Sequence, residues 1–300
     1  MYPIIFQYNG LVISSYGLML MLAFLTCNIL LKKYLISISK DERMADDIIF
    51  YAAIGGILGS KLYYVIEESK YYEFYLSVSN IFKGLLTFNF EVLTQGISQF
   101  GGGLVFLGGL IGGMISVSIY LYKNNIKWLE GADWVAPYLI LGHAIGRIGC
   151  FLVGDCYGTI SNMPWAMTFK NGLPPSTYFN FSLYYPEVFN SELFKSIYPQ
   201  GTSGETLIYV HPTQLYESLT GLIIFLYLNK IRNNRKYYGM VMFEYLFLAG
   251  LARFLVEFLR LNQSYLFNLS GAQLISIFMM ITGMIFMKIN NSKINLHGNS

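Results

Sequence analysis

Long apolar stretches, separated by polar connections, run along almost the whole chain. A bilayer core of about 30 Å requires about 20 apolar residues in a helix. Leu11–Leu31 and Gly101–Tyr122 meet this length without a charged residue, and Gly271–Met287 lies in another uncharged stretch. Four further segments are long enough but carry charges in their interior. The pattern predicts seven transmembrane helices, at about residues 11–31, 47–66, 101–122, 133–153, 212–229, 237–259 and 271–287.

Two of the connections are long and contain many aromatic, Gly and Pro residues. They cover residues 67–100 and 159–210 and are too polar to lie in lipid. We expect them to form a cap on the outer face from short amphipathic or irregular pieces. The first apolar stretch follows no basic segment or cleavage site, which favours a retained span over a signal peptide. We therefore expect one transmembrane domain over residues 1–289 and a disordered tail at 290–300.

The composition supports this interpretation and excludes several classes of protein. Only 12% of the residues are charged and 54% are hydrophobic, with a mean hydropathy of +0.46. An ordinary soluble chain has roughly 25% charged residues. These values exclude a disordered chain and a typical nucleic-acid-binding protein, and three cysteines do not form a disulfide framework. The predicted fold class is an all-α polytopic membrane protein.

The distribution of Lys and Arg predicts its orientation. Of the 20 basic residues, 12 lie in the loops after the first, third and fifth helices or in the tail. Five lie in the opposite connections. Because cytoplasmic loops are enriched in basic residues, we expect the N-terminus outside and the C-terminus in the cytoplasm.

The remaining three basic residues, Lys61, Arg147 and Arg253, lie inside predicted helices. A rise of about 1.5 Å per residue places them roughly 21–24 Å from the cytoplasmic ends. The same rise places Tyr16, Leu107 and Glu217 roughly 8–9 Å below the outer ends. On a core of about 30 Å, these positions define one polar layer in the outer leaflet.

Two interpretations of this layer are open. It is either a set of structural ion pairs or an anion site, because charges within a bilayer usually mark function. Glu257 and Arg260 follow Arg253 at helical spacing, which allows a local network. The three cations share the layer with Asp155, Glu217 and Glu257, and we favour an anion site because charges within a bilayer mark function by default. An anion at this depth suggests a phospholipid head group, which the planar guanidinium of arginine suits.

Five segments resemble, in order, the motifs of the prolipoprotein diacylglyceryl transferase family. They are SYGLM at 15–19, FLGGLIG at 106–112, GRIGCFLVGDCYG at 146–158, HPTQLYE at 211–217 and RFLVEFLR at 253–260. The resemblance implies a multi-pass enzyme of the bacterial plasma membrane with its active site near the outer leaflet. Such enzymes transfer diacylglyceryl from phosphatidylglycerol to the lipobox cysteine thiol of a preprolipoprotein, releasing glycerol phosphate. It implies no metal, cofactor or nucleic acid.

The resemblance also assigns roles to residues of this chain. Arg147 and Arg253 take the phosphate, Tyr16 donates to it, and Glu257 orients Arg253. The remaining positions are expected to contact substrate: Lys61, Gly108, Gly109, Asp155, Gly158, His211, Tyr216 and Glu217. For two of these features a structural role is the alternative. His211 precedes Pro212 at a helix start, as a capping residue would, and the third-helix glycines have the four-residue spacing of close helix packing.

Two departures from the family pattern affect the chemistry. Leu107 replaces the histidine of the usual FHGG motif, a candidate base for the thiol, and Cys150 replaces an asparagine. His143, one helical turn before Arg147, is either a replacement base or a packing residue. Cys150 and Cys156 are either reactive thiols beside Arg147 or small apolar residues. Two other functions therefore stay open: a lipid-dependent transferase with another acceptor, and a non-catalytic lipid-binding or transport protein.

Overall fold

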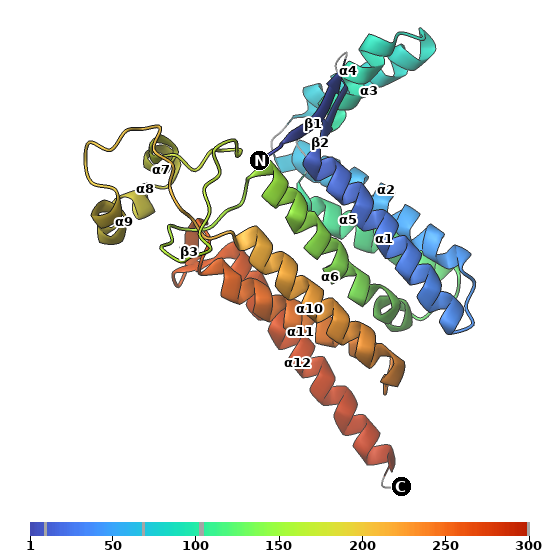
Figure 1. Ribbon diagram of the computed structural model, residues 1–300. Helices are drawn as coiled ribbons and strands as arrows, with labels where there is room; N and C mark the ends of the chain where they lie inside the picture. The colour runs from blue at the N-terminus through green and yellow to red at the C-terminus, as the bar shows by residue number, and fades with distance from the viewer. Residues whose placement is uncertain (9–10, 68–69, 102–104, 299–300) are drawn as a thin grey trace. The chain divides into compact units, whose positions relative to one another are not determined.

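The computed structural model describes residues 1–8, 11–67, 70–101 and 105–298, which are mostly helical (Figure 1). They form two compact units where the sequence predicts one domain over residues 1–289. The first unit contains Met1–Ile4, Ser14–Cys27 and Ala132–Ser300. The second contains Ile5–Ile13 and Asn28–Gly131.

In the second unit, two pairs of helices pack together. Helix α2 (Arg43–Glu67) lies along α5 (Phe106–Lys123), and α3 (Tyr71–Leu86) pairs with α4 (Phe90–Gly101). Glycines allow α2 and α5 to approach closely, because a Cβ atom at Gly112 would overlap the carbonyl oxygen of Gly55. A Cβ atom at Gly108 would likewise overlap the carbonyl oxygen of Gly59. This is the packing role expected of a small-residue face in a membrane.

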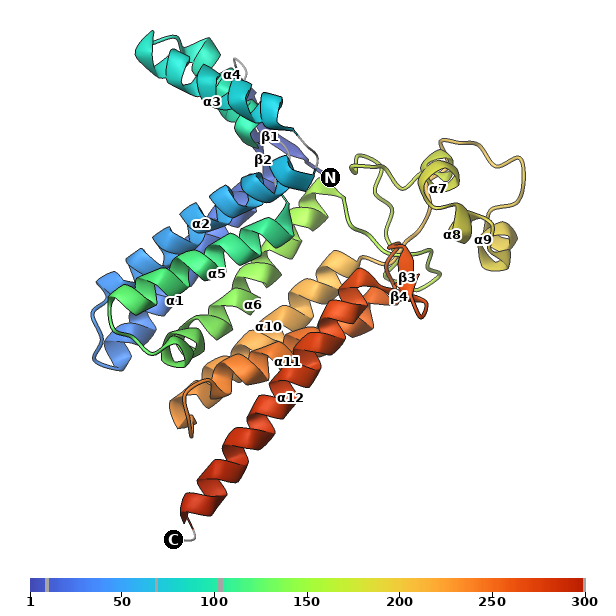
Figure 2. The same ribbon diagram turned by 180° about the vertical axis from the view of Figure 1, so that it is seen from behind.

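The first unit contains the helices that carry most of the expected site residues. Figures 1 and 2 show α6 (Trp128–Val153), α10 (Thr213–Ile231), α11 (Met240–Glu257) and α12 (Gly271–Gly298) side by side. Its remaining long helical segment is the N-terminal half of α1 (Ser15–Ser37), and the turn η1 (Arg232–Asn234) ends α10. Apolar residues of α6, α10 and α11 form a shared core: Ala136, Ile140, Ile224, Leu228 and Val241.

The long connection after α6 has a core of its own. Three short helices, α7 (Tyr178–Tyr184), α8 (Pro186–Phe189) and α9 (Glu192–Ile197), surround the fully buried rings of Phe169, Phe181 and Phe194. Backbone hydrogen bonds join Gly158 to His211 and Thr159 to Leu259. These bonds hold the chain that leaves α6 against the start of α10 and the end of α11.

Some predicted elements differ from the observed ones. Residues 11–14 form the strand β2 (Leu11–Ser14) against β1 (Ile4–Tyr8), so the predicted helix start at residue 11 is wrong. Val12 and Ile13 are β-branched and have an apolar partner strand, and an apolar run does not by itself distinguish strand from helix. A second small sheet pairs β3 (Ser264–Leu266) with β4 (Leu269–Ser270). The tail predicted to be disordered from residue 290 continues α12 to Gly298.

Among the described residues, four helices are long and apolar enough to cross a membrane: Ser15–Ser37, Arg43–Glu67, Trp128–Val153 and Gly271–Asn290. Helix α5 is shorter and also apolar. Helices α10 and α11 lie where the fifth and sixth spans are predicted, and carry charged residues in their interior. The fold is therefore that of a mostly helical, multi-pass membrane protein.

Candidate functional site

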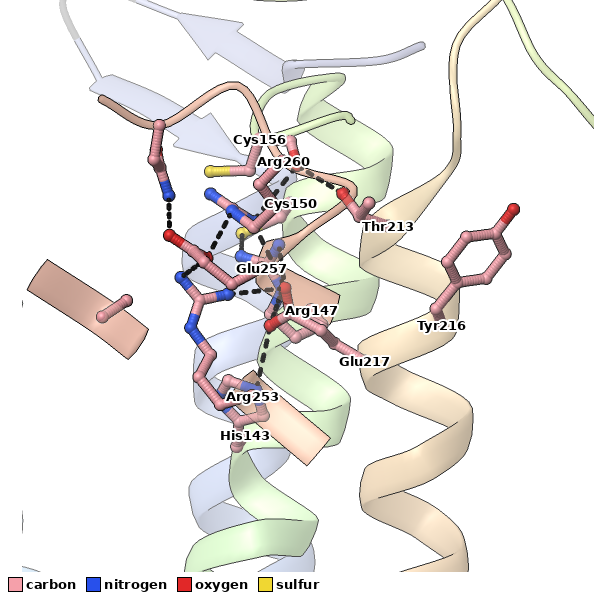
Figure 3. A network of polar contacts seen from close by, with 12 residues as sticks. His143, Arg147, Cys150, Cys156, Thr213, Tyr216, Glu217, Arg253, Glu257 and Arg260 are labelled. Carbon is pink, nitrogen blue, oxygen red and sulfur yellow. Dashed lines mark hydrogen bonds and ion pairs between the residues drawn. The ribbon is translucent and has the colours of Figure 1, made fainter. Parts of the chain in front are cut away.

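Glu217, one turn into α10, is the central carboxylate of a network of charged residues (Figure 3). Its Oε1 accepts hydrogen bonds from Arg253 Nη1 at 2.9 Å and from Arg260 Nη1 at 3.2 Å. Its Oε2 lies 3.1 Å from Arg147 Nε and 3.3 Å from His143 Nε2. Only 5% of this residue is exposed. Three guanidinium groups therefore share one buried carboxylate.

Glu257 is the second carboxylate of the network. Its Oε2 lies 2.8 Å from Arg253 Nη2 and 3.6 Å from Arg260 Nε. Its Oε1 accepts hydrogen bonds from Asn262 at 2.7 Å and from Ser270 at 2.6 Å. Glu257 thus fixes Arg253 and Arg260, as the sequence predicts for Arg253. We call Arg147, Arg253, Arg260, Glu217 and Glu257 the arginine–glutamate network.

Helical spacing places these side chains on facing surfaces. Arg253 and Glu257 are four residues apart on α11, and Arg260 follows three residues later, just beyond the helix end. On α6, His143 and Arg147 are likewise one turn apart. Residues at these spacings lie on one side of a helix, so α6 and α11 both present basic groups to Glu217. With three guanidinium groups and two carboxylates, the network has a surplus of one positive charge.

The last turn of α6 and the loop after it add two thiols and a third carboxylate. Ligand atoms of Cys150, Asp155 and Cys156 all lie within 4.8 Å of one another, and Arg147 Nη1 donates to Cys150 Sγ at 3.4 Å. The backbone of the loop is fixed, because Gln214 donates to the Asp155 carbonyl and Thr213 to the Cys156 carbonyl. We call Cys150, Asp155 and Cys156 the thiol–carboxylate cluster.

The surroundings of this loop shift the pKa values of two groups outside the helices. Burial, reinforced by the charge of Cys156, raises the pKa of the Asp155 carboxyl to about 6. A hydrogen bond from the Cys150 thiol lowers the pKa of the Cys156 thiol, and the guanidinium groups of Arg260 and Arg147 lower it further. Cys156 is exposed whereas Cys150 is buried, so Cys156 is the more accessible thiol.

His211 and Tyr216 belong to a separate group of contacts. The His211 Nδ1 atom lies 3.2 Å from the Tyr216 hydroxyl, which also accepts a hydrogen bond from Trp165 Nε1 at 2.7 Å. Figure 3 shows the Tyr216 ring directed away from the arginine–glutamate network. Burial lowers the pKa of His211 and favours its neutral form. The HPTQLYE motif therefore faces two environments, and only Glu217 contacts the arginines.

The other predicted site residues have varied surroundings. Tyr16 is 42% exposed and packs against Gly149 of α6, where a Cβ atom would stand 3.2 Å from its ring. A Cβ atom at Gly158 would overlap the carbonyl oxygen of Leu259, so this glycine permits the close approach of two backbone segments.

Lys61 belongs to the second unit, where its Nζ donates to the Gln99 carbonyl at 3.4 Å. The polar layer that would join it to Arg147 and Arg253 stays a prediction.

The sequence interpretation missed the full roles of Arg260, Asn262 and Ser270. Arg260 counts as an outer-loop charge in the sequence because the sixth helix is predicted to end at residue 259. Its separation of seven residues from Arg253, two helical turns, is the signal that predicts a shared face. Asn262 and Ser270 also line a groove of about 610 Å³ beside Glu257, together with Tyr185 and Leu261.

Comparison with known proteins supports one family over almost the whole chain. A family model described as prolipoprotein diacylglyceryl transferase matches residues 3–289. A Clostridium tetani protein named phosphatidylglycerol–prolipoprotein diacylglyceryl transferase is 33% identical, over 97% of this chain and 98% of its own length. Proteins of the same name from Finegoldia magna and Aliivibrio salmonicida are each 31% identical. Those matches cover 93% and 95% of this chain, and 92% and 86% of the two relatives.

Proposed function

The chain belongs to the prolipoprotein diacylglyceryl transferase family, and from this premise we propose how its arginine–glutamate network performs the transfer. The protein is a phosphatidylglycerol–prolipoprotein diacylglyceryl transferase, an enzyme of lipoprotein biosynthesis. It moves the diacylglyceryl group of phosphatidylglycerol to a prolipoprotein cysteine, with phosphatidylglycerol and prolipoproteins as its substrates.

We propose seven transmembrane helices with the N-terminus outside, the C-terminus in the cytoplasm and the reaction in the outer leaflet of the bacterial plasma membrane. Helices α1, α2, α5, α6, α10, α11 and α12 supply the spans. The excess of Lys and Arg in the loops after α1, α5 and α10 supports this orientation. A reporter enzyme that is active only outside the cytoplasm, fused within residues 199–205, should be active. The same reporter fused within residues 124–127 should be inactive.

The observation that carries the proposed site is the attachment of three guanidinium groups to one buried carboxylate. Glu217 orients Arg147, Arg253 and Arg260 without neutralising all three, because among the described residues Glu257 is the one other carboxylate that forms an ion pair with them. Each guanidinium has five N–H donors in a planar arrangement, so several remain to bind phosphate oxygens. The surplus positive charge matches the phosphate of phosphatidylglycerol. We place the phosphate against this network and its glycerol backbone toward the groove beside Glu257.

The reaction is a displacement at a carbon of the glycerol backbone. The acceptor sulfur attacks the carbon that carries the phosphate ester, forming a carbon–sulfur bond as the carbon–oxygen bond breaks. The bonding electron pair moves to the phosphate oxygen, and glycerol phosphate leaves. Because negative charge grows on that phosphate, hydrogen bonds from Arg147 and Arg253 strengthen in the transition state and lower the barrier. Tyr16, which packs on the same helix as Arg147, is placed to add a hydroxyl donor.

The thiol must also lose its proton. His143 is the histidine nearest to the phosphate-binding arginines in the sequence, and its Nε2 is paired with Glu217 at 3.3 Å. A carboxylate beside an imidazole orients the ring and stabilises the protonated form. We propose that His143 takes the thiol proton on its other ring nitrogen, Nδ1, in place of the histidine that Leu107 replaces. His211 is less suited to this role, because its ring partner is the uncharged Tyr216 hydroxyl and not a carboxylate that would stabilise a protonated imidazole.

One observation favours a second candidate function, a related transferase with a different acceptor. Leu107 and Cys150 stand where the family has a histidine and an asparagine, so the acceptor side of the site differs more than the phosphate side. Expression in cells depleted of their own transferase separates the two candidates. Prolipoprotein is supported as the acceptor if a lipobox protein gains thioether-linked lipid in these cells. This product should be lost with the Arg147→Ala variant and kept with the Arg43→Ala variant. Normal expression without any thioether contradicts it.

A further inference from the structure

The thiol–carboxylate cluster contains two thiols that the transfer mechanism does not use. Cys150 lies in the last turn of α6, and Cys156 lies in the loop that follows. Their sulfur atoms lie within 4.8 Å of each other (Figure 3). Cys150 is buried whereas Cys156 is exposed. An accessible thiol next to a second, protected thiol is the arrangement of a redox-active pair of cysteines.

The backbone at the end of α6 brings the two cysteines together. The Cys150 carbonyl accepts hydrogen bonds from the backbone N–H groups of Gly154 at 2.9 Å and Asp155 at 3.2 Å. Gly154 has a left-handed φ of 77°, so the chain turns back over the last helical turn. Cys156 is also left-handed, with a φ of 58°, and two hydrogen bonds to its carbonyl hold this uncommon conformation. The proximity of the two sulfur atoms therefore follows from the path of the backbone.

The surroundings give the two thiols different roles. Cys156 lies beside the guanidinium groups of Arg147 and Arg260, which favour its thiolate, the nucleophilic form. The Cys150 thiol has the Asp155 carboxylate as a hydrogen-bond partner. Because of its exposure, Cys156 is the thiol that an external disulfide reaches, and Cys150 is the one that completes an internal bond. An S–S bond is about 2.05 Å long, so side-chain rotation closes the remaining gap.

We propose that Cys150 and Cys156 form a reversible disulfide, with low-molecular-weight disulfides as the oxidant. The Cys156 thiolate attacks one sulfur of the oxidant, whose S–S bond breaks, and one thiolate leaves. The Cys150 thiol gives its proton to the Asp155 carboxylate, and its sulfur attacks the Cys156 sulfur of the mixed disulfide. The second thiolate leaves and takes up that proton. The two cysteines together lose two electrons, and the oxidant is reduced to two thiols.

Oxidation removes an acceptor that competes with phosphate for the arginines. In the reduced protein, Arg147 Nη1 donates to Cys150 Sγ at 3.4 Å. A disulfide has no thiolate charge, and hydrogen bonds to neutral acceptors are weaker than those to charged ones. The oxidised protein should therefore bind phosphatidylglycerol more tightly, with a KM lower by about 2–10-fold, the effect of one hydrogen bond. This consequence rests on the proposed function, whereas the formation of the disulfide does not.

The test measures the redox state of the full-length protein in detergent. Reduced protein is incubated with excess oxidised glutathione, free thiols are alkylated, and the cysteine peptides are identified by mass spectrometry. Most chains should contain the Cys150–Cys156 disulfide, and dithiothreitol should restore both thiols. Cys27 should stay a free thiol throughout, because it is buried outside the cluster. A lasting glutathione adduct on Cys156 of the wild type, or two unreacted thiols, would overturn the proposal.

Two single variants test the assigned order of attack. Cys150→Ser should keep glutathione on Cys156, because no second thiol displaces it. Cys156→Ser should leave Cys150 unreacted, because that thiol is buried. Glutathione on Cys150 in this variant would contradict the assigned roles. Cys27→Ser is the matched control and should form the disulfide as the wild type does. Size-exclusion elution and thermal unfolding identify a variant that fails to fold, and the wild-type result then decides the proposal.

A parallel transfer assay, started after removal of glutathione, keeps this inference separate from the proposed function. Initial rates should give a lower KM for phosphatidylglycerol in the oxidised wild type than in the reduced one. Cys156→Ser should have the same KM after both treatments. A disulfide with an unchanged or higher KM overturns the effect on phosphate binding. Thioether formation without any disulfide overturns the inference and leaves the transferase function intact. A disulfide without thioether formation in either state supports the redox pair and contradicts the proposed function.

Discussion

Arg253 on α11 donates a hydrogen bond of 2.9 Å to Glu217 on α10. The same guanidinium reaches Glu257 at 2.8 Å through its other terminal nitrogen. Arg253 therefore joins the two carboxylates that position all the guanidinium groups of the network. The fork-shaped guanidinium can make both contacts and still present N–H groups to a phosphate, which a single ammonium cannot do.

Glu217→Gln should lower transfer by about 10²-fold or more and reduce stability. The amide keeps the shape of the side chain but leaves three guanidinium groups and His143 without their shared carboxylate. Breaking a buried ion pair from one side costs about 3–5 kcal/mol. The rate of thioether formation and the thermal unfolding midpoint measure the two effects. Glu205→Gln, at an exposed position of the loop, is the control and should change neither. A normal rate in Glu217→Gln would refute the central role of this carboxylate.

Arg253→Lys should lower kcat by about 10–100-fold, with a smaller change in the KM for phosphatidylglycerol. Lysine retains the charge but cannot span Glu217 and Glu257 together, so one donor to the developing phosphate charge is misplaced. Steady-state kinetics with phosphatidylglycerol in mixed micelles measure kcat and KM separately. Arg43→Lys, at an exposed position on α2, should behave as the wild type. Equal activity of Arg253→Lys and wild type would show that charge alone suffices at this position.

His143→Gln should lower kcat by about 10²–10⁴-fold if His143 takes the thiol proton. Glutamine retains a hydrogen bond to Glu217 but accepts no proton at neutral pH. Raising the pH should restore part of the rate, because more of the acceptor thiol is then ionised without a base. His211→Gln is the comparison, since His211 contacts Tyr216 and not the network, and its pH–rate profile should resemble that of the wild type. The same pH–rate profile for His143→Gln and wild type would assign His143 to packing.

Gly112→Ala should destabilise the pair α2 and α5, whereas Gly113→Ala should be tolerated. A Cβ atom at Gly112 would overlap the backbone of Gly55, but at Gly113 the nearest atom is the Ala52 carbonyl oxygen at 3.4 Å. Overpacking of this kind costs typically about 1–3 kcal/mol. Thermal unfolding in detergent compares the two variants, each of which adds one methyl group, at adjacent positions. Equal stability would show that α2 and α5 are not packed through Gly112.

The sequence predicted the long helices well, because a bilayer imposes a length that apolar composition reveals. It also predicted that Arg147, Arg253, Glu217 and Glu257 contribute to one site, since charges inside a membrane have few other roles. The first helix start was wrong at residue 11, because Leu11–Ser14 has the residue types of both a strand and a helix. The strand Leu11–Ser14 forms because it pairs with Ile4–Tyr8, and an apolar stretch does not by itself indicate such a partner.

The detailed site was only partly predictable. Tyr216 and Glu217 are adjacent in one motif, yet adjacent helical residues point about 100° apart, so a shared role did not follow from proximity in sequence. Arg260 joins the network because it lies just beyond the end of α11, close to the helix face that carries Arg253 and Glu257. The thiol–carboxylate cluster depends on a left-handed turn at Cys156 and its contacts with α10, which no spacing rule predicts.

The most direct test of the account is the stoichiometry of transfer by the purified enzyme with phosphatidylglycerol and a lipobox peptide. One glycerol phosphate should be released for each thioether formed on the peptide cysteine, as measured by mass spectrometry. Arg147→Ala should lower both products together by about 10²–10³-fold, because it removes donors from the developing phosphate charge. Arg43→Ala should leave both unchanged. Thioether formation by Arg147→Ala at the wild-type rate, or without release of glycerol phosphate, would contradict the account.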